Sequence, residues 1–482
     1  MKDYPLTLPS LLVALVVGGI VWLVVESSLV AFSVAVLIFA VGITWRRETS
    51  PVFPFILGYQ WVSVTIGYYY SLVTGYFPSV YAPGDVERTM WLSLSGLLLL
   101  ALGMRAAGFG AAPVGADDPA EAQVSNLTGL FWLVMGVYSI NYVYVLNPKA
   151  YASVAAILAR VLDCRQVLLL LLWFEVLRRR THLQYLWITL AWVFVPLLGS
   201  YFSDFKVPLF LLLLAYVSAW KPWTRGWWRI SPAHAVRVGA IVACLLFLAL
   251  VWQAGTKYET RQAYDRSAVG SNPADRVSLF ARSAIDSVPV IFSDPDLVVE
   301  GLVERLSYIT FFSRALDYVP RIHAHTQGEL LKTAVVNAFV PRFLYPDKPE
   351  LPSDSYYTQR FTGLIVSETA TSISIGYMAE FYVDWGVQGM FVMTFLWGCW
   401  LGLAHRALRH LIRPRLLLNP VLLTVFLGAY QFEQQFIKAF GAVNIAFVVT
   451  TALVIAFRTP LMTFLHPAPA EQEQAERAAS TP

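Results

Sequence analysis

Long apolar runs are the feature that most constrains how this chain can fold. A run of roughly 17–25 apolar residues is long enough for a helix to cross the hydrocarbon core of a bilayer. The sequence therefore predicts an all-α polytopic membrane protein. About twelve transmembrane helices are expected, near residues 8–25, 29–44, 51–73, 89–106, 127–146, 162–178, 183–200, 206–220, 235–253, 385–404, 416–431 and 441–458.

The composition agrees with a membrane protein and argues against several other classes. Hydrophobic residues make up 57% of the chain and charged residues 14%, whereas soluble domains are about a quarter charged. The three cysteines all lie inside apolar runs, so we expect neither a disulfide framework nor a cysteine-based metal site. The net charge of +4 is spread among loops without a long run of Lys or Arg, which argues against nucleic-acid binding.

Short loops rich in Arg and Lys indicate the cytoplasmic face of a membrane protein. Such loops occur at residues 46–47, 178–180, 221–229 and 406–415, and all of them follow even-numbered crossings if the N-terminus is inside. The pattern predicts a multi-pass protein with both termini in the cytoplasm. The same alternation places residues 254–384 on the periplasmic face.

These boundaries divide the chain into four parts, of which one large loop is the most unusual. The expected parts are an N-terminal transmembrane bundle of about nine spans at 1–253, a large helical periplasmic loop at 254–384, C-terminal transmembrane helices at 385–458 and a disordered cytoplasmic tail at 459–482. Because the charged motifs concentrate in the loop, we expect the active site there.

Two helices are expected inside this loop. Asp294 at an N-cap position and Pro295 at the first helical position mark the start of the first helix, and Pro320 ends it. Between them apolar residues recur at helical spacing, which is typical of an amphipathic helix on the membrane surface or packed on the bundle. A second helix is expected at residues 328–340, before Pro341.

A proline-rich motif, PRFLYPDKP at residues 341–349, follows the second helix. Its three prolines fix the backbone angle φ within nine residues. A chain stiffened in this way holds Arg342 and Lys348 with little freedom. The motif is therefore either an anion-binding site or a rigid connector.

Two carboxylates occur together in the segment YMAEFYVDWG at residues 377–386. Glu380 and Asp384 are spaced i, i+4 and share a helix face with Tyr377. Gly386 then leads the chain into the next apolar run. Carboxylates at the mouth of an apolar helix are costly unless water, a cation or a reaction uses them. They are either catalytic groups or helix-end carboxylates paired with an Arg of the loop.

Three segments of the chain together resemble a known family. They are RLSYITFF at 305–312, FVPRFLYPDKP at 339–349 and SISIGYMAEFYVDWGVQGM at 372–390. Over this region the chain is similar to the Wzy-type oligosaccharide repeat-unit polymerases of O-antigen and exopolysaccharide synthesis. The resemblance implies a GT-C-like helical bundle in the inner membrane, with no nucleotide sugar, cofactor or metal.

The resemblance also implies a reaction and its site. The substrate is an undecaprenyl-diphosphate-linked oligosaccharide, a hydroxyl of the next repeat is the acceptor, and the lipid diphosphate leaves. Arg305, Arg342 and Lys348 are expected to hold the diphosphate, because cations stabilise the charge that develops on it. Glu380 is expected to accept the acceptor's proton, with Arg342 as the second catalytic residue. Besides membrane lipids, a co-polymerase that regulates chain length is the implied partner.

Other residues complete the set of substrate-binding candidates. Tyr377 and Asp384 are included because they share the face of the proposed base. His323 and His325 lack a third ligand at metal-binding spacing, so they are interpreted as an exposed helix-connecting loop. His323 is kept as a substrate-binding candidate because related O-antigen ligases use polar residues in an equivalent loop.

Charged residues near the ends of the predicted spans have two interpretations. Asp204 and Lys206 lie between the seventh and eighth spans, and Glu433 and Lys438 lie between the last two. These residues either line an entrance for the lipid diphosphate or mark the membrane interface. The cluster Asp85-Val86-Glu87 in the second external loop is interpreted as a solvated turn.

Two other functional classes share parts of this pattern. A flippase or transporter of lipid-linked oligosaccharides would have a similar number of spans, but usually with symmetric halves and short loops. Here one loop dominates and no internal repeat is visible. An O-antigen ligase-like glycosyltransferase is separated from a polymerase only by the resemblance carried by PRFLYPDKP.

Overall fold

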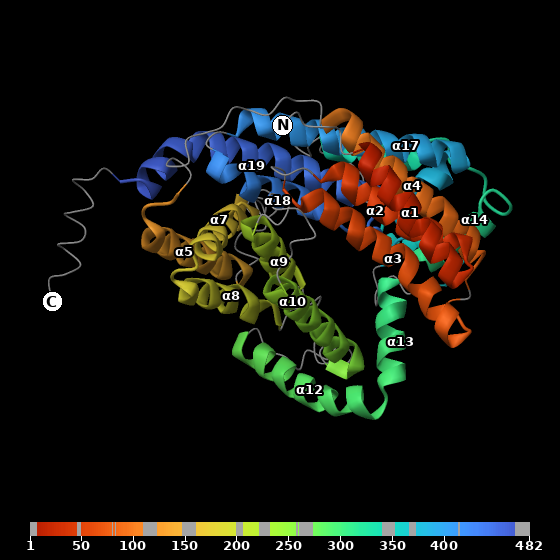
Figure 1. Cartoon of the computed structure of the whole chain (residues 1–482), viewed down its shortest axis with the longest axis horizontal. Coiled ribbons are helices and arrows are strands. Elements are labelled where there is room, and N and C mark those ends of the chain that lie inside the picture. Colours follow the sequence, from red (N-terminus) through yellow and green to blue (C-terminus); the bar gives the residue numbers. More distant parts are fainter. Residues whose placement is uncertain are drawn as a thin grey trace. The chain divides into compact units, whose positions relative to one another are not determined.

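The computed structural model describes an α-helical protein (Figure 1). The described residues are 7–45, 50–79, 81, 83–108, 123–146, 161–198, 206–220, 232–256, 259, 273–339, 352–365, 373–412 and 415–467. Within these ranges no strand occurs. Five of the described helices are long and apolar enough to cross a membrane, namely Leu8–Val25, Val86–Gly108, Ala235–Thr256, Tyr377–Leu411 and Phe436–Leu465. The helical, membrane-type fold class is confirmed in this form, while twelve spans and a GT-C-like bundle remain predictions.

All nine apolar runs before residue 254 form helices. They are α1 (Thr7–Val25), α2 (Ser28–Thr44), α3 (Val52–Thr74), α4 (Val86–Gly108), α5 (Leu127–Leu146), α7 (Arg165–Arg179), α8 (Leu183–Leu198), α9 (Lys206–Trp220) and α10 (Pro232–Val251). Apolar periodicity and length were sufficient to locate these helices, because each run is bounded by polar or glycine-rich sequence.

The last three apolar runs differ from the prediction in length and continuity. The tenth and twelfth form α17 (Tyr377–Leu411) and α19 (Phe436–Leu465), both longer than expected. The eleventh is not one regular helix, because α18 (Leu418–Phe426) lies between two 3₁₀ turns, Arg415–Leu417 and Leu427–Ala429. At about 1.5 Å per residue, nine residues of α-helix reach less than half of the ~30 Å hydrocarbon core.

The described residues of the predicted loop form five complete α-helices before α17, where two were expected. They are α12 (Pro273–Ser293), α13 (Pro295–Leu306), α14 (Ile309–Tyr318), α15 (Glu329–Phe339) and α16 (Asp354–Thr362). The start of α13 and the position of α15 are as predicted, and Asp294 Oδ1 accepts a hydrogen bond from Leu297 N–H at 3.2 Å. A single amphipathic helix from Asp294 to Pro320 is wrong, because the chain leaves the helix at Ser307–Tyr308. There the Tyr308 N–H donates to the Ser63 carbonyl of α3 at 3.1 Å.

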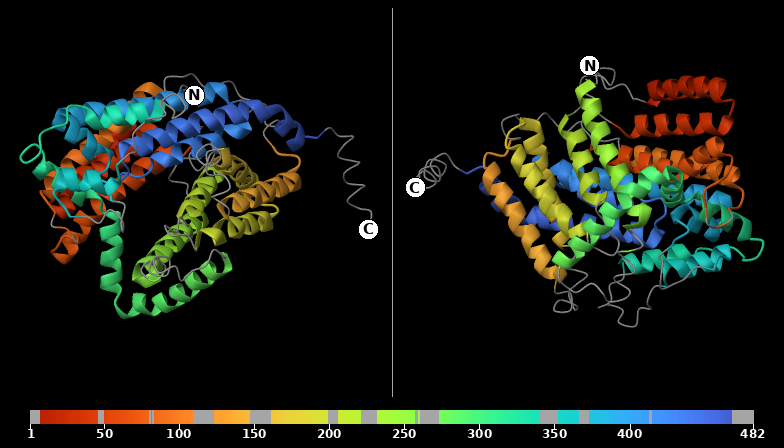
Figure 2. Two further views of the ribbon diagram at one scale, coloured as in Figure 1. Left: turned by 180° about the vertical axis from the view of Figure 1, so that it is seen from behind. Right: turned by 90° about the horizontal axis from the view of Figure 1, so that it is seen from below.

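The chain divides into two compact units built from segments that are distant in sequence. The first comprises Met1–Ala112, Val299–Ala407 and Phe426–Ile445, and the second comprises Pro113–Val298, Leu408–Val425 and Ala446–Pro482. Within the first unit, α14 packs against α3, α4 and α16, and Figure 2 shows these green-to-cyan helices beside the red and orange ones. All candidate site residues that the structure describes belong to this unit, apart from Lys206 in the second.

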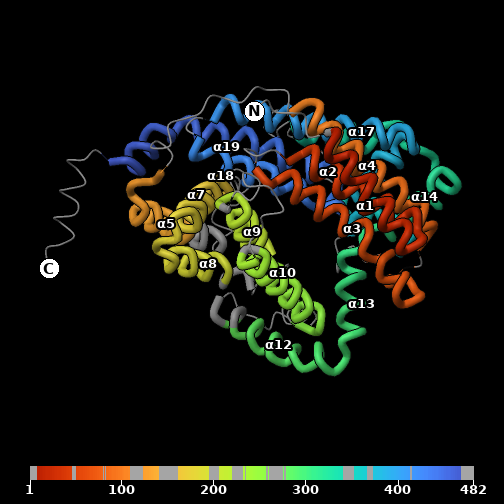
Figure 3. Tube along the Cα trace, in the orientation of Figure 1, coloured from red at the N-terminus to blue at the C-terminus, as the bar shows by residue number. Residues whose placement is uncertain are grey.

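Direct backbone contact between α4 and α17 holds the first unit together (Figure 3). A Cβ atom on Gly398 would collide with the Leu100 carbonyl, and one on Gly103 would collide with the Phe395 carbonyl. Gly402, four residues after Gly398, approaches the α4 backbone in the same way. Small residues at this spacing allow close packing of membrane helices, and here they fix α17 against α4.

A kink at Gly386 divides α17 into two parts with different surroundings. Gly386 has φ 69° and ψ −166°, a left-handed backbone that favours glycine. Every residue from Tyr377 to Asp384 is buried, and this part carries both carboxylates. From Val387 to His405 the helix contains no Asp, Glu, Lys or Arg. The kink therefore separates a buried polar segment from an apolar one, as the position of Gly386 in the sequence suggested.

Candidate functional site

Glu380 lies in the first turn of α17 and contacts the start of α19. Its carboxylate Oε2 accepts a hydrogen bond from the Phe436 N–H at 2.8 Å, and its side chain is buried. Phe436 is the first residue of α19, and the first N–H groups of a helix have no partner within that helix. The carboxylate supplies one such partner at the positive end of the helix dipole. This contact fixes the orientation of Glu380.

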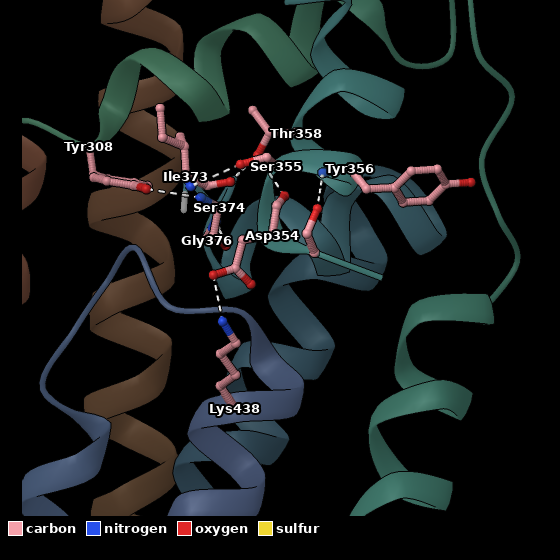
Figure 4. A network of polar contacts seen from close by, with 10 residues as sticks. Tyr308, Asp354, Ser355, Tyr356, Thr358, Ile373, Ser374, Gly376 and Lys438 are labelled. Carbon is pink, nitrogen blue, oxygen red and sulfur yellow. Dashed lines mark hydrogen bonds and ion pairs between the residues drawn. The ribbon is translucent and has the colours of Figure 1, made fainter. Parts of the chain in front are cut away.

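A second carboxylate reaches the same helix start from α16 (Figure 4). Lys438 Nζ, in the first turn of α19, donates to Asp354 Oδ2 at 2.5 Å. Asp354 is 9% exposed and the Lys438 side chain is 49% exposed. The residues that the two carboxylates contact, Phe436 and Lys438, are two positions apart at the start of α19. Glu380, Asp354 and Lys438 therefore form one charged group, called here the α19 cluster.

Hydrogen bonds join two of the motif segments beside this cluster (Figure 4). The Ser374 N–H donates to the Tyr308 hydroxyl oxygen at 3.0 Å, and the Gly376 N–H donates to Ser374 Oγ at 3.1 Å. Thr358 Oγ1 of α16 donates to the Ile373 carbonyl at 2.7 Å. The Tyr308–Ser374 hydrogen bond joins residues 66 positions apart in the chain. It brings the segments RLSYITFF and SISIGYMAEF together next to α16.

Two further charged residues lie near Tyr308. Arg305, in the last turn of α13, is exposed, and Glu433, before α19, is half-buried. Burial raises the pKa of the Tyr308 hydroxyl, and the Arg305 guanidinium opposes that rise while Glu433 and Asp354 add to it. Tyr308 is therefore a neutral hydroxyl in a charged environment. Arg305, expected to contact the diphosphate, lies in the same neighbourhood as Asp354.

Asp384 has a different role from Glu380 in this structure. Its Oδ1 accepts hydrogen bonds from Thr326 Oγ1 and from the Leu330 N–H at 3.1 Å, and its Oδ2 accepts one from the Leu331 N–H at 2.9 Å. Both backbone donors belong to the first turn of α15, and the side chain is fully buried. A carboxylate in this position caps a helix. Asp384 therefore caps α15 through hydroxyl and backbone donors, whereas the sequence suggested a catalytic role or a pairing with an Arg of the loop.

Tyr377 is also engaged within the fold. Its hydroxyl donates to Gln60 Oε1 of α3 at 2.8 Å, and Gln60 Nε2 donates to the Ala429 carbonyl at 3.0 Å. Tyr377 and Gln60 are both buried. The pair ties the first turn of α17 to α3 and to the turn before α19. This arrangement favours a structural role for Tyr377 over contact with substrate.

His323 and His325 occupy the loop between α14 and α15, as expected. His323 Nδ1 lies 2.7 Å from the Ala324 carbonyl, and its ring meets the Phe361 ring edge to face. His325 Nδ1 lies 3.1 Å from the Val383 carbonyl. Among the described residues, no group of three or more His, Cys, Asp or Glu side chains is placed to hold a metal ion.

The cluster Asp85-Val86-Glu87 forms the start of α4. Asp85 Oδ1 accepts a hydrogen bond from the Arg88 N–H at 2.9 Å, which is an N-cap contact. Glu87 accepts one from the Tyr68 hydroxyl at 3.3 Å, and both acidic residues are exposed. This geometry agrees with the interpretation as a solvated turn. Lys206 is the half-buried first residue of α9.

Three of the predicted charged residues, Arg342, Lys348 and Asp204, lie outside the described residues. The chain on either side of the first two is placed, however. The Phe339 ring, at the end of α15, packs on the Phe440 ring with centroids 5.7 Å apart, and Asp354 follows on α16. Both anchor points contact the first turns of α19. The described residues that flank this segment, Phe339 and Asp354, therefore both lie against α19.

Asp354 is the cluster member that sequence reasoning missed, and Lys438 was considered only as part of a lipid-diphosphate entrance or as a membrane-interface charge. They are 84 positions apart, so no local spacing relates them. One signal was present: a lysine in the first turn of a helix is unfavourable beside the helix dipole. Such a lysine needs a compensating carboxylate, but the sequence did not locate the start of α19.

The site and fold together define a helical, membrane-type protein with a charged cluster beside two of its motif-bearing segments. A family model described as a domain of unknown function (DUF8712) matches residues 237–409. The match contains Asp354, Glu380 and Asp384 but ends before Lys438. No curated protein matches the chain, and no solved structure matches it.

Proposed function

We propose that the chain is a membrane glycosyltransferase that joins undecaprenyl-diphosphate-linked oligosaccharide repeat units into a cell-surface polysaccharide. The observation that carries this proposal is the Tyr308–Ser374 hydrogen bond, which joins two of the three segments that resemble Wzy-type polymerases. Their junction lies beside Glu380 and Asp354, the buried carboxylates of the α19 cluster. A transferase of this kind needs a carboxylate base next to a site for the donor, and the motif segments converge on such a carboxylate.

The reaction assigns Glu380 as the general base. The acceptor hydroxyl oxygen forms a bond to the anomeric carbon of the donor, and the bond from that carbon to the diphosphate oxygen breaks. Glu380 takes the hydroxyl proton, and the lipid diphosphate leaves with the electron pair. The Phe436 N–H holds one carboxylate oxygen of Glu380 and so orients the group. Because Glu380 is only 6% exposed, neighbouring side chains must shift for the acceptor to reach it.

Cations would stabilise the departing diphosphate. Arg342 and Lys348 belong to the proline-rich motif, which lies outside the described residues, and Arg305 is exposed at the end of α13. Arg offers two parallel hydrogen bonds to a phosphate, whereas Lys acts as a point charge. Fixed charges at a leaving group lower the barrier without reorganisation during the reaction. We therefore keep these three residues as the diphosphate site.

Reconstitution of the purified protein with lipid-linked single repeats tests the proposal. The wild type should give a ladder of longer lipid-linked products. Arg342→Ala should abolish the ladder, and Arg342→Lys should restore it in part, because charge returns without the planar fork. Arg321→Ala, an exposed Arg of the same region, is the matched control and should leave the ladder intact. A wild-type protein that produces no ladder would contradict a polymerase.

Deletion of the gene separates the polymerase from the two other classes. Loss of a polymerase leaves single repeats that are still exported and attached. Loss of an O-antigen ligase-like enzyme leaves long lipid-linked chains, and loss of a flippase keeps single repeats inside the cell. Adding a chain-length-regulating co-polymerase should narrow the product ladder of the wild type.

The proposed reaction also requires an orientation in the inner membrane. With both termini cytoplasmic and the site periplasmic, reporter fusions after Arg180 and Arg229 should behave as cytoplasmic. A fusion near Asp294 should behave as external. A cytoplasmic signal near Asp294 would contradict a periplasmic polymerisation.

A further inference from the structure

We propose that α12 lies in the interface of the bilayer, with the side chains of Ile285 and Phe292 inserted into lipid. The sequence placed this part of the chain in the periplasmic loop, outside the membrane. Contact between α12 and lipid does not depend on the proposed reaction, and it is carried by the exposure of these side chains and by the place where α12 is attached to the fold.

Three stripes of residues run along α12, because residues spaced three or four positions apart share a helix face. The stripe that faces the rest of the chain is buried and consists of Phe280, Ser283 and Ser287. A second stripe is polar and exposed and consists of Arg282, Asp286 and Ser293. The third stripe is apolar, and its two large residues, Ile285 and Phe292, are 70% and 77% exposed. The helix thus buries two hydroxyl groups and leaves an isoleucine and a phenylalanine uncovered.

The buried stripe attaches α12 to the end of a candidate membrane span, Ala235–Thr256. This span ends in η5 (Trp252–Thr256), and α12 packs against η5 and α10 (Figure 1). The Phe280 ring stacks on the Trp252 ring with centroids 6.2 Å apart, and the Ser287 and Thr256 hydroxyl oxygens lie 3.0 Å apart. Tryptophan is enriched where membrane spans meet the headgroups. These contacts therefore hold α12 at the level where the span leaves the hydrocarbon core.

The surface of this span faces lipid. Of its most apolar stretch, 6% is buried inside the protein, and Leu246 and Phe247 in its middle are 48% and 44% exposed. An apolar stripe on a helix fixed to the end of such a span continues the lipid-facing surface. A helix with an apolar stripe beside a charged one is also the pattern that binds in the membrane interface. Both observations favour lipid as the occupant of the α12 stripe.

Helix α14 shows the alternative arrangement, in which the fold itself covers an apolar stripe. Ile309, Phe312 and Leu316 recur at helical spacing and are at most 5% exposed, because α14 packs against α3, α4 and α16. The sequence left open whether an amphipathic helix of this loop lies on the membrane or packs on the bundle. α14 packs on the bundle. The apolar stripe of α12 is left uncovered by the fold, and insertion into lipid removes it from water.

Single fluorescent labels in proteoliposomes of phosphatidylethanolamine and phosphatidylglycerol test this contact. The background is the full chain with alanine in place of its three cysteines, Cys164, Cys244 and Cys399. Bromine atoms on the acyl chains near the headgroup should quench a label on Ile285→Cys or Phe292→Cys at least about threefold more than one on Arg282→Cys. Leu246→Cys, in the middle of the span, is the control for depth. Its label should be quenched most by bromine atoms at the ends of the acyl chains.

Iodide, a quencher confined to water, separates the other possible surroundings of α12. Equal quenching of the labels at 285, 292 and 282 by iodide, with none by the brominated lipids, would place α12 in water and overturn the proposal. Protection of the first two labels from both quenchers would overturn it in favour of a protein partner, such as a second copy of the chain. If the cysteine-free chain does not fold, a photoreactive benzoylphenylalanine in place of Phe292 in the otherwise unchanged chain gives the same decision. Irradiation should attach phospholipid to the protein, as measured by mass spectrometry, and attachment to protein alone would overturn the proposal.

Discussion

Glu380 and Asp384 are one helical turn apart on α17, but their surroundings differ in kind. Asp384 accepts three hydrogen bonds, two of them from the first turn of α15. Glu380 accepts one from the first residue of α19, and the Asp354–Lys438 ion pair lies at the same helix start. The hydrogen bonds of Asp384 hold the start of α15 in place. Glu380 is a buried carboxylate that shares the start of α19 with an ion pair from α16, and such groups are candidates for function. The spacing of the two carboxylates in the sequence does not distinguish their roles. Their hydrogen-bond partners in the structure do.

The largest expected effect is a loss of polymerisation rate in Glu380→Gln, which distinguishes Glu380 from Asp384. Glu380→Gln keeps size and hydrogen-bonding capacity but removes the base, so the polymerisation rate should fall by about 10²–10⁴-fold. Its unfolding temperature should change little, because the amide oxygen can still accept from the Phe436 N–H. Product ladders and thermal unfolding on the same preparation measure both quantities. Equal, small rate losses for Glu380→Gln and Asp384→Asn would make both residues structural and move the base to the loop of His323 and His325.

Asp384→Asn should show the opposite pattern. An amide has only one acceptor oxygen and no charge, so at least one donor at the start of α15 loses its partner. The free energy of unfolding should fall by about 1–3 kcal/mol, and the rate at a temperature where the protein is folded should fall less than about tenfold. Denaturation in detergent measures the first quantity. An Asp384→Asn variant that is inactive but fully stable would reverse the comparison.

The parts of this region that sequence predicted are those governed by local chemistry. The cap at Asp294, the first-turn Pro295 and the passage into an apolar run at Gly386 each depend on residues that are adjacent in the chain. Apolar runs located the helices for the same reason. Local patterns thus identified where helices begin, bend and bury their side chains.

The parts that sequence could not predict depend on distant partners. The break at Ser307–Tyr308 follows from contacts with Ser63 and Ser374, and the apolar spacing continues through it unchanged. The Asp354–Lys438 pair joins residues on helices whose proximity exists only in the folded chain. Apolar periodicity contains no information about either contact, so one amphipathic helix was predicted and Asp354 was overlooked.

A smaller effect on stability is expected from substitution of Gln435. This residue precedes Phe436, whose N–H donates to Glu380. Its side chain is 3% exposed, and within the described part of the chain its Nε2 has no hydrogen-bond partner. A buried donor without a partner costs about 1–3 kcal/mol. Gln435→Leu should therefore raise the free energy of unfolding by about 1 kcal/mol, in contrast to Asp384→Asn. A loss of stability on thermal unfolding would show that the amide is bonded, as the donors around Asp384 are.

The smallest expected effect is on the pH dependence of stability and concerns Glu329. Glu329 is the first residue of α15, the helix that Asp384 caps. Hydrogen bonds from Arg360 hold the pKa of the Glu329 carboxyl below its ordinary value of 4.5. A lowered folded-state pKa contributes stability above the unfolded-state pKa, and this contribution is lost as the pH falls through the folded-state value. Because the Glu329 side chain is 48% exposed, solvent screening limits the contribution to less than about 1 kcal/mol. The unfolding temperature of Glu329→Gln should lie slightly below that of the wild type at pH 7, and the difference should shrink below about pH 4. High salt at pH 7 should also shrink it, while the polymerisation rate at pH 7 stays within about twofold. A difference that grows on acidification would mean that Glu329, like Glu380, is surrounded by like charges.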